Sequence, residues 1–250
     1  MLNFNKQKFY FYNKKTKLFG KKLINFDLIN STNSYACKFE NKIANLKDKN
    51  NFIEKFNGTV IISETQSNSY GRNYKRWLSP SGGLWFTLIL ITNLNILDLE
   101  NINILMAISI IEAINNNFNL DLKLKWPNDI YYEGKKLCGI LSELNSIKNK
   151  KFLNIGVGLN VNNSFNETAD DINNNDDDDN KKNIINKDLL NAISLIDILK
   201  LKNNKSNNEF INKEKLLSDI LSCFEINYEK YLINKDMKNI FLKIKNQILI

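Results

Sequence analysis

The stretch "KWPNDIYYEGKKLCGIL", Lys125–Leu141, decides the fold expected for this chain. It holds two runs rich in aromatic and aliphatic residues, separated by Glu133-Gly134, a pair typical of a tight turn between antiparallel strands. The preceding run "LDLKLKW", residues 120–126, predicts one more strand. Pro127 stiffens the exit from that strand, and Lys125 presents an ammonium group at its end. The stretch therefore predicts three short strands joined by tight connections.

The segments on both sides of this stretch predict further strands and long helices. The strands expected from apolar runs are 22–30, 58–64, 83–91 and 151–162. The helices expected from apolar residues at helical spacing run from Ser31 or Thr32 to about Asn50, over 98–118, over 189–199 and within the remainder of the chain, including its closing segment 239–250. Because strands dominate the middle of the chain without regular alternation with helices, we expect an α+β fold with a mixed sheet covered by helices.

Composition excludes several classes of function. No apolar run approaches the roughly 18 residues that a membrane span needs. The net charge of +8 favours acidic partners, but Asn, Lys and Ile are frequent throughout, so compositional drift explains much of it, and no Arg-rich stripe indicates nucleic-acid binding. The absence of histidine excludes Ser–His and Cys–His catalysis and His-ligated zinc, and the cysteines Cys37, Cys138 and Cys223 form no CxxC pair. An enzyme of this composition must work through positioning, Lys and Arg charges, or carboxylates.

The segment from about residue 166 to 186 is rich in Asn and Asp and poor in apolar residues. We expect a disordered surface insertion there. A metal-binding cluster is the alternative, but Asp176–Asp179 are contiguous and lack the spaced ligands of a calcium loop. Residues 1–21 are expected to be an N-terminal extension without a secretory signal, and residues 22–250 one domain. The Asn, Lys and Ile bias is typical of an AT-rich genome such as that of a protozoan parasite, which favours a cytoplasmic or organellar (plastid or mitochondrial) location.

A long basic loop, Glu64–Gly83, separates two of the expected strands. Its part "GRNYKRWLSPSGG" (71–83) suits an anion such as phosphate, because backbone N–H groups and Arg side chains can converge on phosphate oxygens. An ordinary surface loop with a Trp packed beneath it is the alternative. No Walker A sequence occurs, and "GVGLN" (156–160) lacks the third glycine of a dinucleotide-binding turn. In the same way, "KWPND" (125–129) suits either a phosphate site or a structural turn.

Four short sequence motifs occur one after another along the chain. They are "STN" (31–33), "ETQSNSYGRNYKRWLSPSGGLWFTL" (64–88), "KWPNDIYYEGKKLCGILSE" (125–143) and "IGVGLNVN" (155–162). Together they closely resemble the catalytic domain of biotin protein ligases, a family that includes the holocarboxylase synthetases. The resemblance covers residues 22–165. It implies a mixed, mainly antiparallel sheet flanked by helices, as in class II aminoacyl-tRNA synthetases, and this agrees with the fold expected from the apolar pattern.

The resemblance implies a ligase reaction in two steps. Biotin and ATP give biotinoyl-5′-AMP and pyrophosphate, and a lysine of a biotin carboxyl carrier domain, such as that of acetyl-CoA carboxylase, then takes the biotinoyl group as an amide. Because the biotin carboxylate is already a nucleophile, the reaction needs orientation and neutralisation of phosphate charge by Arg, Lys and Mg²⁺ rather than a histidine base. A lipoate or octanoate ligase of the same fold and a non-catalytic biotin-binding relative are the alternatives.

The resemblance also implies roles for individual residues. The biotin-binding residues it implies are Ser31, Thr32, Asn33, Gln66, Gly71, Arg72, Lys136, Gly139, Gly156 and Gly158. The residues it implies for ATP and the adenylate are Arg72, Trp77, Lys125, Asn128, Asp129, Lys136 and Asn160. The catalytic residues it implies are Lys136, Arg72 and Lys125. Lys136 is expected to be the main electrostatic group at the biotin carboxylate and α-phosphate, and Asp129 is the implied contact for Mg²⁺.

The basic loop departs from the family pattern, which is close to Q-x-x-G-R-G-R-x-G-R-x-W. Gly71, Arg72 and Trp77 match it, whereas the first Gly is Ser69, the first Arg is Tyr70, the later Gly is Tyr74 and the last Arg is Lys75. We expect these substitutions to loosen the loop and let the adenylate escape more readily. No helix–turn–helix motif precedes Lys22, so DNA is not an expected partner, and the small C-terminal β domain usual in the family is expected to be absent. A homodimer is left open.

Overall fold

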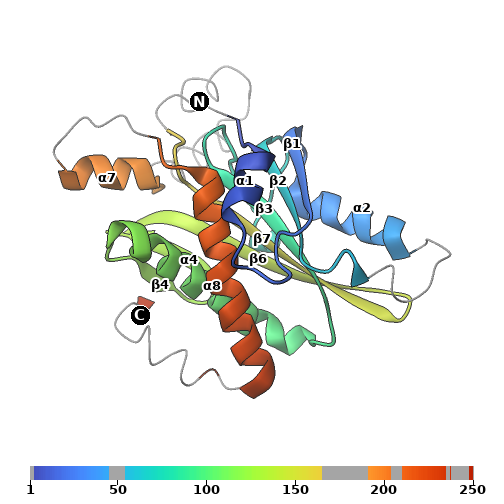
Figure 1. Cartoon of the computed structure of the whole chain (residues 1–250). Coiled ribbons are helices and arrows are strands. Elements are labelled where there is room, and N and C mark those ends of the chain that lie inside the picture. Colours follow the sequence, from blue (N-terminus) through green and yellow to red (C-terminus); the bar gives the residue numbers. More distant parts are fainter. Residues whose placement is uncertain are drawn as a thin grey trace.

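A mixed eight-stranded β-sheet with helices on both faces forms the framework of the molecule (Figure 1). The structure is a computed structural model that describes residues 3–44, 54–164, 191–203, 210–234, 237 and 248–249. The strands are β1 Leu23–Ile29, β2 Thr59–Gln66, β3 Leu84–Thr92, β4 Lys123–Lys125, β5 Asp129–Tyr132, β6 Lys135–Ile147, β7 Lys150–Leu159 and β8 Ile248–Leu249. Their spatial order is β1-β2-β3-β7-β6-β5-β4-β8. Only the outermost pairs, β1/β2 and β4/β8, are parallel within this sheet, so the mixed, mainly antiparallel arrangement is confirmed.

The helices lie in two layers, one on each face of the sheet. They are α1 Lys6–Tyr12, α2 Thr32–Ala44, α4 Leu99–Phe118, α7 Leu195–Asn203 and α8 Lys213–Asn234, with short 3-10 turns η1 Arg72–Tyr74 and η2 Ile96–Asp98. The long helices α4 and α8 pack together over one face, and α1 lies against α8 (Figure 1). Helix α2 covers part of the opposite face, above β2, β3 and β7. None of the described helices is long and apolar enough to cross a membrane.

The central strand β3 shows why the middle of the sequence is so apolar. Leu84, Phe86 and Leu88 point into the core under α4 and α8, whereas Ile89 belongs to the smaller core under α2. Trp85 is also fully buried. Because both faces of this strand are covered, it reads as a continuous apolar run rather than as an alternating one.

The predicted hairpin at Glu133-Gly134 is confirmed. Both residues have a φ in the left-handed region, 47° and 79° respectively, as a two-residue turn between antiparallel strands requires. The hairpin pairs β5 with β6 and sets Asp129 opposite Gly139. On its other side, β5 pairs with β4 and sets Asp129 opposite Lys125. The turn therefore brings residues from three strands to one place.

The helix predicted for residues 189–199 is wrong in its first part, because α7 begins at Leu195. Asn191 and Ile193 instead exchange backbone hydrogen bonds with Lys136: the Lys136 amide donates to Asn191 O at 2.6 Å, and the Ile193 amide donates to Lys136 O at 3.0 Å. The hydroxyl of Ser194 accepts a hydrogen bond from the Asp197 amide at 3.4 Å, in the manner of a helix N-cap. A polar cap inside the apolar stretch thus marks the helix start.

The closing segment 239–250 was predicted to be helical, and this is wrong for Ile248–Leu249. These two residues form β8, which pairs in parallel with β4. Without β8, the three-residue strand β4 would lie at the sheet edge with unpaired backbone N–H and C=O groups. The backbone of another extended segment can pair with them. The other residues of this segment, the acidic insertion predicted at 166–186 and the predicted helix end at 45–50 lie outside the described residues.

The segment predicted as an N-terminal extension packs against the rest of the fold. Phe4, Phe9 and Phe19 are buried in the main core. The carboxylate of Glu225 on α8 accepts backbone hydrogen bonds from residues 17–19 at 2.6, 2.7 and 3.0 Å. The described part of this segment therefore belongs to the same structural unit as the sheet.

A buried carboxyl group lies beneath α2. The Glu40 side chain is fully buried, and its Oε2 accepts one hydrogen bond from Asn145 Nδ2 at 2.9 Å. Its Oε1 has no hydrogen-bond partner among the described residues. Burial raises the pKa of Glu40 to about 7; the nearby amides of Asn145 and Asn154 oppose this shift, and the charge of Glu143 adds to it.

We expect Glu40→Gln to stabilise the protein at alkaline pH. Because the folded pKa lies above the ordinary value of 4.5, the folded state holds its proton more tightly, and stability falls as pH rises toward 7. The free energy of unfolding of the variant should therefore exceed that of the parent by about 3 kcal/mol near pH 8 and equal it near pH 4. Urea unfolding at both pH values measures this. Glu54→Gln, at an exposed glutamate, should change neither value, and an equal effect of both variants would refute the assignment.

Candidate active site

The basic loop folds back on itself as an irregular hairpin. Gln66 is bridged to Ser79 at its base, and Tyr70 is bridged to Arg76 nearer its tip. At the tip Tyr74 has a φ of 55°, in the left-handed region, at the position where the family pattern has glycine. The hairpin lies on the face of the sheet that α2 covers, where its tryptophan packs on Gly139 and Gly158 and Tyr70 contacts Glu143. We call residues 66–79 the covering loop.

The first predicted phrase, Ser31–Asn33, lies at the start of α2 and is buried. The Thr32 amide and hydroxyl donate to Gln66 Oε1 at 2.8 and 3.2 Å. The hydroxyl of Thr87 on β3 lies 2.9 Å from Thr32 Oγ1 and 2.6 Å from Asn33 Oδ1. The structure thus joins Thr32, Asn33, Gln66 and Thr87 into one polar cluster, which we call the polar pocket. Ser31 lies beside it and accepts a hydrogen bond from the Ser34 amide, and the predicted contacts of Ser31, Thr32, Asn33 and Gln66 with biotin stay predictions.

Trp77 of the covering loop lies directly on the backbone of β6 and β7. A Cβ added at Gly139 would meet the Trp77 ring at 3.0 Å, and one added at Gly158 would meet Trp77 Nε1 at 2.5 Å. A Cβ at Gly156 would collide with the amide of Asn33. These three glycines therefore make room for protein side chains in this structure, and their predicted approach to biotin stays a prediction. Trp77 Nε1 is buried with no hydrogen-bond partner among the described residues.

Lys136 stands at the edge of this tryptophan. Its Nζ lies 5.1 Å from the centroid of the Trp77 ring and 2.8 Å from Asp129 Oδ2. The side chains of Lys136 and Asp129 are 30% and 20% exposed, so the ion pair is accessible to a ligand from one side. The second oxygen of Asp129, Oδ1, is buried without a hydrogen-bond partner among the described residues. An accessible ammonium group and a spare carboxylate oxygen suit a phosphate with an associated cation.

The side chain of Arg72 reaches across from the covering loop to the "KWPND" turn. Its Nη1 donates to Asn128 Oδ1 at 3.4 Å. Asn128 is otherwise structural, because it exchanges hydrogen bonds with the backbone of Ile140 at 2.8 and 2.9 Å. Lys125 shares the sheet face of Asp129, but its Nζ lies 5.1 Å from the centroid of the Tyr131 ring. The site thus gathers Arg72, Asn128, Asp129 and Lys136, with Lys125 at its margin.

Asn160 lies behind the site rather than in its open part. The residue is buried, its amide donates to Leu137 O at 3.0 Å, and its Nδ2 donates to Lys136 O at 3.4 Å. Its Oδ1 accepts from Asn163 Nδ2 at 3.3 Å. These contacts hold the backbone of Lys136 in place, and the predicted contact of Asn160 with a nucleotide stays a prediction. Gly71, also predicted to bind biotin, has a φ of −107° and no close neighbour, so its backbone does not require glycine.

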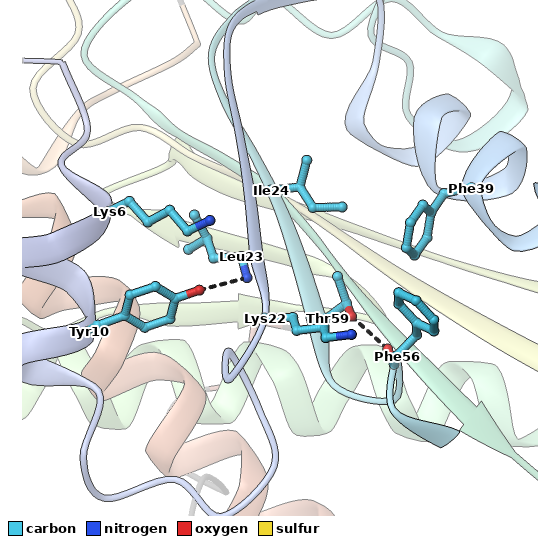
Figure 2. A pocket seen from close by; sticks show the side chains of 8 residues that line it. All are labelled: Lys6, Tyr10, Lys22, Leu23, Ile24, Phe39, Phe56 and Thr59. Carbon is cyan, nitrogen blue, oxygen red and sulfur yellow. Dashed lines mark hydrogen bonds between the residues drawn. The ribbon is translucent and has the colours of Figure 1, made fainter. Parts of the chain in front are cut away.

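A second hollow, beside β1, contains none of the predicted residues. It is lined by Lys6, Tyr10, Lys22, Leu23, Ile24, Phe39, Phe56 and Thr59. Figure 2 shows Tyr10 on one side of β1 and Phe39 and Phe56 on the other. The Tyr10 hydroxyl accepts a hydrogen bond from the Leu23 amide at 3.1 Å, and the Lys22 ammonium lies 3.8 Å from the centroid of the Phe56 ring. Its walls are mainly apolar, whereas the site under the covering loop gathers cations and carboxylates.

Sequence reasoning missed several residues that build the site. Glu143 accepts hydrogen bonds from Asn33 Nδ2 at 2.7 Å and from the Tyr70 hydroxyl at 3.3 Å, and Ser79 Oγ accepts from Gln66 Nε2 at 2.8 Å. The signal for Glu143 was available. Because strand residues alternate between faces, Glu143 shares the face of Gly139. Thr87 and Ser79 carried no such signal.

Comparison with known proteins identifies the family of the chain. Residues 26–162, more than half of the chain, match the model of the biotin/lipoate A/B protein ligase family. The chain belongs to this family. The Bacillus subtilis (strain 168) bifunctional ligase/repressor BirA is 28% identical over 220 residues, which cover 87% of this chain and 57% of the relative. The Arabidopsis thaliana biotin–protein ligase 2 is 34% identical over 127 residues, or 45% of this chain and 36% of the relative. The chain thus spans little more than half the length of the BirA relative.

Solved structures of biotin protein ligases share the fold of this family member. The enzyme from Aquifex aeolicus in complex with biotin and ATP superimposes with a TM-score of 0.61 at 23% identity, covering 92% of this chain and 79% of that one. The enzyme from Leishmania major in complex with biotinyl-5-AMP gives a TM-score of 0.54 at 17% identity, covering 86% and 79% respectively. At these identities the likeness establishes the architecture expected from the sequence.

Proposed function

We propose that this member of the biotin/lipoate A/B protein ligase family activates biotin with ATP and transfers it to a lysine of a biotin carboxyl carrier domain. One observation carries the proposal: the covering loop, the polar pocket at the start of α2 and the Lys136–Asp129 pair lie together on one face of the sheet. These parts lie far apart in the sequence, and the family resemblance implies that each serves the same reaction. The names of the relatives, which are biotin–protein ligases and BirA ligases, support the same activity.

The first step needs positioned charge rather than a proton acceptor. An oxygen of the biotin carboxylate attacks the α-phosphorus of ATP, the bond from that phosphorus to the bridging oxygen breaks, and pyrophosphate leaves. Lys136 and Arg72 supply the cations that offset charge on the transferring phosphoryl group, and Asn128 orients Arg72. The polar pocket of Thr32, Asn33 and Gln66 offers donors and acceptors for the head group of biotin.

The second step forms an amide. The neutral amine of the acceptor lysine attacks the acyl carbon, the bond from that carbon to the AMP oxygen breaks, and the amine loses a proton. Trp77 covers the β6 and β7 backbone between the pocket and Lys136, so the loop shields the adenylate from water when it is closed. Asp129, through its unpartnered Oδ1, is the residue that would hold Mg²⁺. Bound there, Mg²⁺ would neutralise phosphate charge.

The decisive experiment is transfer of labelled biotin to a carboxyl carrier domain in the presence of ATP. We expect labelling that depends on ATP, on biotin and on the acceptor lysine of the carrier. Addition of excess lipoate tests the alternative ligase, because a lipoate ligase would lose biotin labelling in favour of lipoyl transfer. A protein that binds biotin but releases no pyrophosphate would instead be a non-catalytic relative. A homodimer and a cytoplasmic or organellar location stay predictions.

A further inference from the structure

We propose that Tyr70 and Glu143 form a latch that holds the covering loop on the rim of the pocket before substrate binds. Tyr70 is then a positioning residue at the place where the family pattern has arginine. The kinetic consequences of this inference rest on the proposed function, whereas its structural consequence does not. The latch joins the covering loop to β6, and Gln66 joins the base of the loop to α2.

The latch is a hydrogen bond from a tyrosine hydroxyl to a carboxylate that is already oriented. Tyr70 OH lies 3.3 Å from each oxygen of Glu143. Asn33 Nδ2 fixes that carboxylate from the other side at 2.7 Å. Burial, followed by the negative charge of Glu143, raises the pKa of Tyr70 to about 12, so its hydroxyl stays a donor throughout the ordinary pH range. At 3.3 Å to both oxygens the hydrogen bond is long and shared between two acceptors, so its contribution is that of one modest bond.

A second anchor lies one residue earlier. The Ser69 hydroxyl donates to Trp77 O at 2.6 Å and lies 2.8 Å from Ser79 Oγ, which also binds Gln66. Ser69 replaces the first glycine of the family pattern, and it is buried. The two residues that depart from the pattern at 69 and 70 therefore make the bonds that tie the loop down. The looser loop expected from the sequence stays a prediction, and these contacts argue for the opposite.

The backbone at the tip of the loop has an unfavourable conformation, which the anchors must stabilise. Asn73 and Tyr74 both have a φ of 55°, a region that residues with a Cβ rarely occupy. Such conformations persist only where the surroundings fix them. With Ser69 and Tyr70 holding one arm and Trp77 the other, the loop is ordered before a ligand arrives. Ordering it in advance removes part of the entropy cost of binding.

Limited trypsin digestion of the free protein tests the latch directly. Lys75 and Arg76 are exposed in the loop, so trypsin cuts there when the loop opens. We expect Tyr70→Phe to accelerate cleavage after these two residues about three- to tenfold, since one hydrogen bond to a charged group is lost. Tyr74→Phe, at the exposed tyrosine of the same loop, is the matched control and should cleave like the parent. Glu143→Ala should accelerate cleavage to a similar extent, and adding Tyr70→Phe to it should give no further increase.

The result that would overturn the latch is a parental cleavage rate in Tyr70→Phe, or a full additional increase in the double variant. If the protein is an active ligase, Tyr70→Phe should also raise KM for biotin by a similar factor and leave kcat nearly unchanged, because loop ordering then affects substrate and transition state alike. A fall in kcat alone would assign Tyr70 a different role. If the chain has no ligase activity, the digestion result still decides for or against the latch.

Discussion

Replacing Lys136 by alanine should lower the rate of biotinoyl-adenylate formation by about 10²–10³-fold. In the structure Lys136 is the ammonium group beside both Trp77 and Asp129. The developing charge on the transferring phosphoryl group is then left without the cation aligned to meet it. We expect the loss in kcat, since the polar pocket proposed to bind the head group is untouched. Pyrophosphate release in the presence of biotin and ATP measures it.

Lys135→Ala is the matched control for this variant. Lys135 is the exposed neighbour of Lys136 in the same strand, so its loss should leave the rate within about twofold of the parent, as is usual for a surface substitution. Asp129 loses its ion-pair partner in Lys136→Ala, so urea unfolding of the variant separates a folding defect from a catalytic one. Adenylate formation at a parental rate by a folded Lys136→Ala protein would remove Lys136 from the proposed mechanism.

The fold could be predicted where a local signal has a single structural meaning. A two-residue hairpin turn requires positive φ at both of its residues, and Glu133 and Gly134 both adopt it. The apolar run of β3 requires cover on both faces. The strand at Ile248–Leu249 could not be predicted, because only the free edge of β4 selects it. The start of α7 was missed because Ser194 stands inside an apolar stretch whose first part pairs with Lys136 instead.

Some residues of the candidate site could be predicted from the sequence and others could not. The phrases that resemble the family located Lys136, Asp129 and Trp77, and the structure brings them together. Thr87, which contacts Thr32 and Asn33 across the sheet, has no pattern of its own in a single sequence, whereas strand alternation could have located Glu143. The covering loop is the part of the site whose contacts were least expected from the sequence. Substitutions that appear in the sequence only as lost glycine and arginine turn out to be hydrogen-bonding residues.

A buried ion pair joins the start of α8 to β2, just before the covering loop. No sequence pattern predicted it. Lys213 Nζ lies 2.7 Å from Glu64 Oε2, and the side chains are only 7% and 8% exposed. Glu64 Oε1 also accepts hydrogen bonds from Ser81 Oγ at 2.7 Å and the Gly82 amide at 3.0 Å. Burial by itself would raise the pKa of Glu64, but the hydrogen bond and charge of Lys213, with Ser81 and Gly82, lower it overall.

Lys213→Met should destabilise the protein by about 3–5 kcal/mol near neutral pH, because it leaves the carboxylate of Glu64 buried without its cation. Because the folded pKa of Glu64 is lowered, the stability that the pair contributes is present above the ordinary pKa and is lost as pH falls through the folded value. The difference between parent and variant should therefore shrink in acid. Urea unfolding at neutral and acidic pH measures both effects.

Two further variants separate the buried pair from a general effect of losing a lysine. Lys215→Met, two residues along α8, breaks the partly exposed pair with Asp219 and an exposed hydrogen bond to Asn117, and it should cost about 1 kcal/mol or less. Glu64→Gln added to Lys213→Met removes the stranded charge but keeps an acceptor for Ser81 and Gly82, so the double variant should recover much of the lost stability. A double variant no more stable than Lys213→Met would show that packing of the lysine stem, rather than charge, holds α8 to the base of the covering loop.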